Sequence, residues 1–391
     1  MKQSADVVII GGGVEGCSIA YNLARDGCSN IVLLEKKTLA SGSTGKSCGI
    51  IRTHYSQELL MAMAHKSMSV FRGFEDEFEA KSGFVTNGLV FLGTSEEVEG
   101  LRDVTVMQQK LGIRAELVHP DNLPKFHSGI SLDGIELASY EPDAGFADPY
   151  GVTVGFAGGA RRLGVEINEG VEATGIEVKN GRVEAVVTTK GRIATRTVVN
   201  AAGPWARRVG AMVGADLPLF VLRFQESVMR PAQGYPLSMP TVFDQRTICY
   251  YRPESGGFMI FGGAVIELQP IEDPDNYSEK ADTEWVENVA NVLLSGMNNS
   301  SDMKYVRGWA GPITVTPDFN PILGPLEQAE GFYIAAGFSG HGFKLSPMVG
   351  KCMAELIMNG AARSVDITPL RASRYKEGKY FQSKYARAPL T

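Results

Sequence analysis

The segment that most constrains the fold is the amino-terminal stretch VVIIGGGVEGCSIAYNLARDGCSNIVLLEK, residues 7–36. A continuous apolar strand precedes a Gly-x-Gly-x-x-Gly motif at Gly11, Gly13 and Gly16. Apolar residues spaced by three and four then indicate a helix, and a second apolar strand ends in Glu35. This order predicts a βαβ unit of the kind that binds dinucleotides.

The chemistry of the motif follows from its geometry. The first glycines permit a tight turn and the close approach of a pyrophosphate, and Gly16 lets the helix pack on the strand. The positive end of the helix then faces the phosphates, and Glu35 is placed to accept hydrogen bonds from both ribose hydroxyls. The motif leaves NAD and FAD open. A Gly/Ser-rich loop, residues 36–56, follows instead of another helix, and this favours a longer cofactor.

Part of that loop, Ala-Ser-Gly-Ser-Thr-Gly-Lys-Ser at positions 40–47, fits a relaxed P-loop pattern with alanine in place of the first glycine. A P-loop leaves a buried strand and enters a helix directly. Here polar residues precede the segment and Cys48-Gly49-Ile50-Ile51 makes a poor helix start. The context therefore argues against a nucleoside-triphosphate hydrolase.

Composition excludes several other classes. The 391 residues leave room for two domains, and a net charge of −6 without a Lys/Arg run argues against a nucleic-acid or anionic-membrane surface. The first strand starts at Val7, which leaves no room for a signal peptide, and no apolar run reaches the ~18 residues of a membrane span. We expect a cytoplasmic protein. The odd number of cysteines, five, and the unpatterned histidines predict neither a disulfide framework nor a metal site.

Alternating apolar residues predict strands over 84–92, 219–229 and 248–266, which we expect to form one antiparallel sheet. An Asn180-Gly181 pair predicts a hairpin turn, and a buried strand is expected over 197–201. No repeat or low-complexity linker divides the chain, so two interleaved domains are expected rather than two consecutive ones.

Near the end of the chain the run AAGFSGHGFKLSP, residues 335–347, places Lys344 at the edge of a glycine-rich turn that opens a helix. Glycine lets the backbone approach a flat group, and a helix N-terminus prefers a negatively charged partner. The run therefore predicts a bound anion. The alternative is a tight strand-to-helix turn whose lysine is solvated.

Taken together, five segments resemble the flavin-dependent D-amino acid oxidase superfamily, and within it the sarcosine oxidases and the β subunits of sarcosine oxidase and dye-linked proline dehydrogenase. They are the βαβ unit, the SGST loop running to Arg52, TVVNAAGPWA at 197–206, WAGPITVTPDFNPILGP at 309–325, and AAGFSGHGFKLSP. The resemblance covers nearly the whole chain. It implies a mixed α/β (α+β) fold in which a Rossmann-like FAD-binding domain is interleaved with an antiparallel-sheet substrate domain. The implied bounds are 1–83, 141–215 and 310–391 for the FAD-binding domain, and 84–140 and 216–309 for the substrate domain.

The resemblance also implies which residues hold FAD. The glycine motif and Glu35 would hold the ADP half, Ser43 and Thr44 the pyrophosphate, and the backbone of Val171 the adenine. Backbone groups of the carboxy-terminal turn would stabilise negative charge on the reduced flavin. The full implied set is Gly11, Gly13, Val14, Glu15, Gly16, Glu35, Lys36, Ser43, Thr44, Gly49, Ile50, Val171, Gly203, Trp205, Gly337, Gly340, His341, Gly342, Phe343 and Lys344.

On the substrate side, the resemblance implies that Arg52 and Lys344 grip a carboxylate and that Tyr251 faces the substrate. The implied reaction is FAD-dependent oxidation of the C–N bond of a small secondary or N-methylated amino acid. Hydride passes to flavin N5, and water hydrolyses the resulting imine. Oxygen or another acceptor then takes the electrons, and a homo- or hetero-oligomer is compatible with the resemblance. The alternatives are a dehydrogenase of a hydroxy acid or glycerol phosphate and a non-catalytic electron-transfer flavoprotein subunit.

Some positions depart from the family patterns. Gly311 stands where monomeric sarcosine oxidases carry a flavin-linked cysteine, and Lys46 stands near the linking histidine of dimethylglycine dehydrogenases, so we expect non-covalent FAD. Met259 falls near the lysine that assists oxygen reduction, which leaves oxidase and dehydrogenase open. Thr314 and Gly340 fall where glycine and D-amino acid oxidases carry arginines, so the carboxylate clamp of those enzymes is absent.

Overall fold

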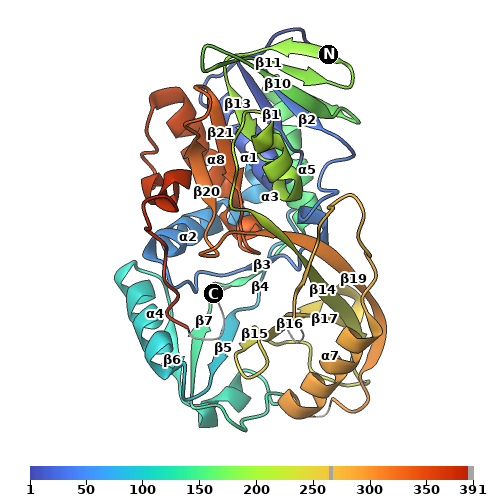
Figure 1. Cartoon of the computed structure of the whole chain (residues 1–391). Coiled ribbons are helices and arrows are strands. Elements are labelled where there is room, and N and C mark those ends of the chain that lie inside the picture. The colour runs from blue at the N-terminus through green and yellow to red at the C-terminus, as the bar shows by residue number, and fades with distance from the viewer. Residues whose placement is uncertain (264–266, 299, 386–391) are drawn as a thin grey trace.

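A mostly parallel sheet and a large, mostly antiparallel sheet occupy the two ends of the molecule (Figure 1). The computed structural model describes residues 1–263, 267–298 and 300–385. The strands of the parallel sheet lie in the order β20 (Ile322–Pro325), β21 (Phe332–Ala336), β13 (Val198–Asn200), β1 (Val7–Ile10), β2 (Ile31–Glu35) and β9 (Glu166–Glu169). Each neighbouring pair is parallel except β20 and β21. The mixed α/β fold class predicted above is confirmed.

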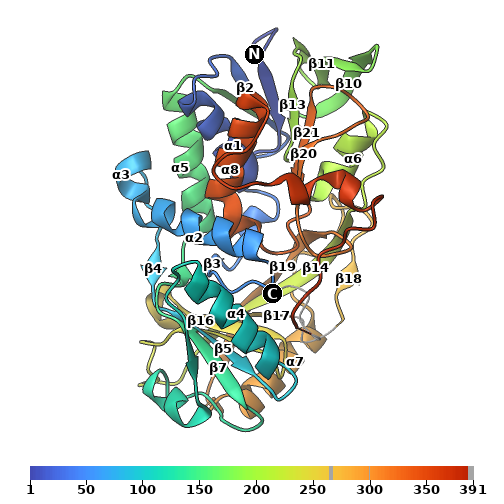
Figure 2. The same cartoon turned by 90° about the vertical axis from the view of Figure 1, so that its left-hand side faces the viewer.

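The βαβ unit forms as predicted, with α1 (Val14–Arg25) between β1 and β2. Helix α1 packs against α5 (Pro149–Arg162) and α8 (Gly342–Asn359) on one side of the sheet (Figure 2). The contact with α8 is close, because a Cβ on Gly350 would lie 2.1 Å from the Ser18 hydroxyl oxygen. The amino-terminal motif and the carboxy-terminal run, far apart in sequence, therefore lie side by side.

The large sheet runs in the order β18 (Gln269–Pro270), β14 (Phe220–Arg230), β17 (Phe258–Gly263), β16 (Cys249–Glu254), β15 (Thr241–Asp244), β5 (Leu89–Gly93), β7 (Leu137–Glu141) and β6 (Glu116–Val118). A long strand, β19 (Lys304–Val315), also pairs with β14. One face packs on α7 (Thr283–Gly296) through a buried core that includes Tyr251 and Phe261. Phe91 and Tyr250 lie on the opposite face. They belong to a second hydrophobic core, which also includes residues of α1 and α8.

The structure corrects two details of the predicted sheet. The expected strand over 84–92 is two short strands, because Gly88 takes a positive φ of 76° and breaks the extended chain. Strand β4 (Val85–Thr86) joins a small separate sheet with β8 (Gly145–Phe146) and β3 (Ile50–Ile51). The sheet is also not wholly antiparallel, since β15 and β5 run parallel. Positions 264–266 of the expected strand over 248–266 lie outside the described residues.

The hairpin predicted at Asn180-Gly181 is confirmed. Both residues have positive φ, 51° and 74°, and connect β10 (Ala173–Lys179) to β11 (Arg182–Thr188), which pairs in turn with β12 (Gly191–Ala194). The remaining helices are α2 (Glu58–Arg72), α3 (Phe74–Phe78), α4 (Val98–Lys110) and α6 (Ala206–Ala211). Among the helices of the described ranges, none is long and apolar enough to cross a membrane.

Candidate active site

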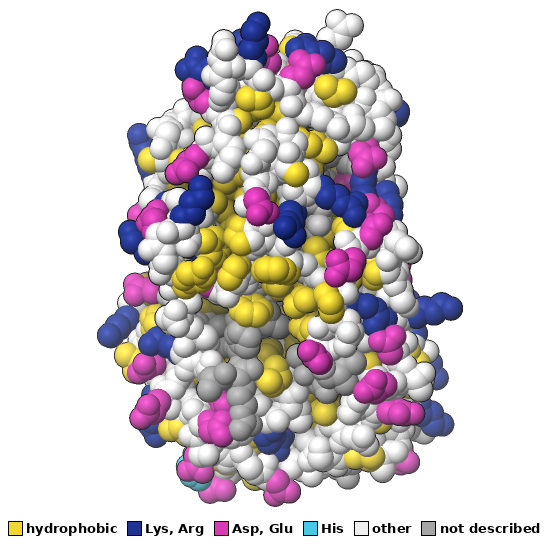
Figure 3. All heavy atoms as spheres, viewed as in Figure 1, with side chains coloured by type: hydrophobic (Ala, Val, Ile, Leu, Met, Phe, Trp, Pro, Cys, Tyr) yellow, Lys and Arg dark blue, Asp and Glu magenta, His cyan; other side chains and the backbone are white. Residues whose placement is uncertain are grey.

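A cavity of about 360 Å³ reaches from the carboxyl ends of β1 and β2 to the inner face of the large sheet. On the face seen in Figure 3, hydrophobic side chains gather in a band across the middle of the molecule, between the ends that carry the two sheets. Ligands of open parallel sheets bind outside the carboxyl ends of the strands, so this position favours a ligand that spans both parts.

The three motif glycines have different structural roles. Gly11 has a φ of 119°, and a Cβ there would lie 2.3 Å from the Ala201 carbonyl oxygen. A Cβ on Gly16 would lie 2.0 Å from the Gly11 carbonyl oxygen, so only glycine allows this turn. A Cβ on Gly13, by contrast, would meet only the Thr44 hydroxyl, at 3.3 Å. Gly11 and Gly16 therefore build the turn, and Gly13 keeps the N-terminus of α1 accessible from the cavity.

Glu35 is held in place by the backbone around it. Its carboxylate accepts hydrogen bonds from the N–H groups of Gly12, 2.8 Å, and Lys37, 2.7 Å. The backbone N–H of Val171 donates to the Glu35 carbonyl at 2.9 Å, which places Val171 beside it on the cavity wall. A carboxylate fixed in this way has lone pairs left for the two hydroxyls of a ribose.

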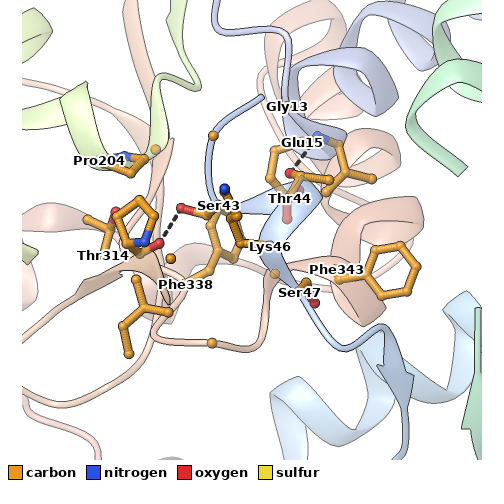
Figure 4. A pocket seen from close by; sticks show the side chains of 18 of the residues that line it. Gly13, Glu15, Ser43, Thr44, Lys46, Ser47, Pro204, Thr314, Phe338 and Phe343 are labelled. Atoms are coloured by element: carbon orange, nitrogen blue, oxygen red, sulfur yellow. Dashed lines mark hydrogen bonds between the residues drawn. The ribbon is translucent and has the colours of Figure 1, made fainter. Parts of the chain in front are cut away.

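Two hydrogen bonds hold the Gly/Ser-rich loop beside the cavity (Figure 4). The Thr44 hydroxyl accepts a hydrogen bond from the Val14 N–H at 3.2 Å, and the Ser43 hydroxyl donates to the Pro312 carbonyl at 2.6 Å. The Lys36 Nζ lies 4.0 Å from the ring centroid of Trp205, and both residues line the cavity. The loop thus connects α1 to β19, and both hydroxyl residues line the cavity between these elements.

The carboxy-terminal turn presents a second helix N-terminus to the cavity. Gly337 and Gly340 have positive φ values, 75° and 85°, and α8 starts at Gly342 without a side-chain cap from the residue that precedes it. The buried Glu15 carboxyl lies against this turn, because a Cβ on Gly342 would be 2.9 Å from its Oε1. Burial raises the pKa of Glu15 well above its usual range, which favours the neutral acid. The open N–H groups of α8 therefore favour an anionic or polar group of a ligand.

Arg52 and Lys344 meet at this end of the cavity. Both side chains are buried, and both lie near the ring of Tyr55, at 4.6 Å from the guanidinium carbon and 6.0 Å from the ammonium nitrogen. Burial, and then the positive charge of Arg52, lower the pKa of Lys344 to about 7. The Lys344 ammonium also donates a long hydrogen bond, 3.5 Å, to the Gly340 carbonyl. Two like charges held together in this way favour an anionic ligand.

Most of the residues proposed above line this cavity. Besides Arg52 and Lys344, they are Gly11, Gly13, Val14, Glu15, Glu35, Lys36, Ser43, Thr44, Ile50, Val171, Gly203, Trp205, Gly337, Gly340, His341, Gly342 and Phe343. Gly16 lies behind the turn. Gly49 does not line the cavity either; it has a φ of 70° and a Cβ there would lie 2.1 Å from the Ala147 carbonyl, so it serves a tight backbone contact.

The structure does not place Tyr251 in the cavity. Its ring centroid lies 5.4 Å from that of Phe261, in the core beneath α7. Successive strand residues point to opposite faces, so the preceding residue, Tyr250, lines the cavity instead. The Tyr250 hydroxyl donates to Glu226 at 3.0 Å. Sequence reasoning missed Glu226, and the only signal for it was the alternation of strand β14, in which Phe224 and Glu226 share a face.

The site fits FAD on the chemistry of its donor groups. Open helix N-termini, a fixed carboxylate and positions with no side chain line one continuous cavity, and a Cβ on Gly203 or Gly340 would meet no atom within 4 Å. Gly311 lies against Lys46, because a Cβ there would be 2.5 Å from the Lys46 Cβ. Neither residue offers a nucleophilic sulfur or imidazole, so non-covalent binding remains our prediction for the cofactor.

Comparison with known proteins identifies the family to which this chain belongs. The chain is 29% identical to the dimethylglycine dehydrogenase of Rattus norvegicus over 99% of its own length, but it spans only 46% of that relative. It is 26% identical to sarcosine oxidase subunit beta of Rhodobacter capsulatus, over 98% of this chain and 92% of the relative. The structure of L-proline dehydrogenase from P. horikoshii matches with a TM-score of 0.89 and 28% identity, over 97% of this chain and all of the other. The family described as DAO, FAD dependent oxidoreductase, matches residues 6–356, and the chain belongs to this family of FAD-dependent oxidoreductases.

Proposed function

We propose that the chain oxidises the C–N bond of a small secondary or N-methylated amino acid and uses FAD as the oxidant. The observation that carries the proposal is the pair of buried cations, Arg52 and Lys344, at one end of the cavity. Burial and the charge of Arg52 disfavour the Lys344 ammonium, and a carboxylate bound beside both groups would stabilise it. An amino acid supplies that carboxylate one carbon away from its nitrogen.

The relatives support the same substrate class. Dimethylglycine, sarcosine and L-proline, named in three relatives, each join a carboxylate to an alkylated nitrogen through one carbon. The clamp would fix such a substrate by its carboxylate, which leaves the nitrogen and the adjacent C–H bond to face the cavity. The lining there includes the apolar side chains of Leu89 and Phe243, which would disfavour water around the reacting bond.

The cofactor would lie along the cavity with its ADP part near Glu35 and its ring near the first turn of α8. When bound, FAD supplies a two-electron acceptor for the hydride of the substrate. The open N–H groups of α8 would stabilise negative charge on the ring. Because one relative is a β subunit that this chain covers over most of its length, we extend the proposal to a hetero-oligomer in which a partner or oxygen receives the electrons.

The test is anaerobic mixing of the purified yellow protein with sarcosine, dimethylglycine, L-proline, glycine and D-alanine. We expect bleaching of the flavin absorbance by one of the first three and little or none by glycine or D-alanine. A flavin that no amino acid reduces would contradict the proposal. Bleaching by D-alanine alone would exclude the substrate class while leaving amino acid oxidation intact.

A further inference from the structure

A row of side chains on the cavity face of the large sheet lies apart from the proposed carboxylate clamp, Arg52 and Lys344. Phe243 on β15 pairs with Tyr250 on β16, Tyr250 pairs with Gly262 on β17, and Gly262 pairs with Glu226 on β14. Directly paired residues point to the same face of a sheet. Gly262 has no side chain, and a Cβ there would lie 2.3 Å from the Tyr250 hydroxyl. The absence of that Cβ lets the Tyr250 hydroxyl cross the strand and reach Glu226.

Glu226 is buried, with 4% of its surface exposed, and lines the cavity. Its Oε1 accepts the hydrogen bond of the Tyr250 hydroxyl, 3.0 Å. Its Oε2 is buried and has no well-directed donor among the described residues, although the Cys48 N–H and the Arg252 charge act on the carboxyl group. These neighbours only partly offset the cost of burying the carboxylate, so a positively charged group of the ligand would stabilise its ionised form.

Aromatic faces surround the same place. The ring centroids of Phe224 and Phe243 each lie 6.3 Å from that of Tyr250, with interplanar angles of 8° and 28°. All three rings line the cavity. Aromatic faces attract alkylated ammonium groups, and a carboxyl group at their edge adds a full negative charge when it ionises.

We propose that Glu226, together with Phe224, Phe243 and Tyr250, forms a subsite for the positively charged, N-alkylated nitrogen of the substrate. The inference rests on the proposed function, because it assumes that Arg52 and Lys344 hold the carboxylate end of the same molecule. It deepens that function by assigning the enzyme a zwitterionic substrate whose nitrogen carries methyl or ring carbons. The carboxylate clamp alone would not distinguish such a substrate from a neutral carboxylic acid of the same shape.

The ionisation of Glu226 supplies a pH signature. Burial raises its pKa to about 8, against the opposing effects of the Tyr250 hydroxyl, the Arg252 charge and the Cys48 backbone N–H. Strands β17 and β19 place Gly262 and Trp309 beside it, and neither of these titrates. The Cys48 thiol is also close, but burial raises its pKa above the usual value, so it stays neutral near pH 8. A cation binds best to the ionised carboxylate. Preference for a cationic ligand should therefore rise with pH toward about 8 and level off above it.

The test compares two isosteric ligands that are not substrates, trimethylglycine and 3,3-dimethylbutanoate. Both carry the same carboxylate and three methyl groups. The methyl groups are attached to a permanently positive nitrogen in trimethylglycine and to a neutral carbon in 3,3-dimethylbutanoate. Dissociation constants are measured on the FAD-loaded enzyme from changes in flavin absorbance. The ratio of the two constants cancels the titration of Lys344, because both ligands present the same carboxylate to it. We expect the wild type to prefer trimethylglycine by about 10- to 100-fold above pH 8.

Three variants sharpen the comparison. Glu226→Gln keeps the shape, and we expect it to lose about tenfold or more of the preference while binding of 3,3-dimethylbutanoate stays within about twofold. Glu116→Gln, at an exposed position of the same sheet outside the cavity, is the matched control and should change neither constant. Tyr250→Phe removes the donor to Glu226 but keeps the ring, so the preference should persist and its pH midpoint should move upward.

The outcomes separate the subsite from the proposed function. Equal binding of both ligands by the wild type, or a preference that Glu226→Gln leaves intact, would refute the subsite and leave the carboxylate clamp standing. Binding of neither ligand would refute the clamp and the subsite together. If Glu226→Gln does not fold, the wild-type pH profile and Tyr250→Phe still decide, because a ratio independent of pH overturns the assignment.

Discussion

Replacing Lys344 by methionine removes one of the two positive charges of the proposed clamp and keeps much of the aliphatic stem. The side chain is 6% exposed and lines the cavity, so its packing is largely preserved. The flavin should remain bound, because the groups of this turn that face it are expected to be backbone N–H groups. The loss should therefore fall on the substrate carboxylate.

The size of the loss follows from the environment of Lys344. A pKa of about 7 in place of 10.5 means that the protein disfavours the ammonium by ~5 kcal/mol, an upper limit on what a bound carboxylate can restore. The net value of a charge-assisted hydrogen bond is smaller, about 1.5–3 kcal/mol. We therefore expect Lys344→Met to weaken binding of the acid by roughly 10- to 150-fold.

The pH dependence has a defined sign. The lowered pKa means that Lys344 is charged below about pH 7 and neutral above it. The wild type should therefore bind 3,3-dimethylbutanoate best near pH 6 and more weakly as the pH rises, by up to about tenfold for each pH unit. Lys344→Met should show no such change, so the difference between the two proteins should shrink toward pH 9.

The assay is titration of the FAD-loaded enzyme, together with steady-state kinetics on the best amino acid and on its methyl ester. Lys351→Met, on the same helix but outside the cavity, is the matched control and should behave as the wild type. If the variant loses binding energy equally in the ground state and the transition state, KM rises and kcat stays the same. If the substrate nitrogen is also misplaced, kcat falls as well. Equal losses for acid and ester, or none for either, would refute the clamp and assign Lys344 to the turn or the flavin.

Three further outcomes are expected. Glu35→Ala should weaken FAD retention by about 1.5–3 kcal/mol for each ribose hydrogen bond lost, measured by FAD titration of the apoprotein, and unchanged retention would move the adenosine site. Acid precipitation should release the flavin into the supernatant; colour retained in the pellet would show a covalent bond. Gly262→Ala should destabilise the fold by about 1–3 kcal/mol in urea unfolding, because its Cβ would lie 2.3 Å from the Tyr250 hydroxyl. Gly175→Ala, whose Cβ would meet its nearest atom at 3.8 Å, should cost much less, and equal costs would contradict the packing argument.

Much of the cofactor end of the site was predictable because its determinants are local. A strand, a glycine turn and a helix must follow one another directly to build the phosphate site, so their spacing along the chain carries the information. Gly11, Gly13 and Glu35 line the cavity for this reason. The same holds for Lys344, which a glycine-rich turn places at the start of α8.

The large sheet was less predictable because its pairing joins distant segments. The break at Gly88 depends on a positive φ that places β4 and β5 in different sheets, and the parallel pairing of β5 with β15 joins segments about 150 residues apart. The alternation of apolar and polar residues predicts a strand, but it does not predict which strand it pairs with or in which direction.

The sequence by itself therefore determined the βαβ unit with its glycine turn, and it indicated two cations that a resemblance assigned to one substrate. Tertiary structure alone decided which tyrosine faces the cavity, because Tyr250 and Tyr251 are adjacent and the phase of the strand sets which of them is turned toward α7. It also decided that Glu226 lies beside Tyr250, since that contact requires three strands in register and a glycine between them. A motif within one segment fixes its own geometry, whereas a contact across a sheet exists only once the strands have paired.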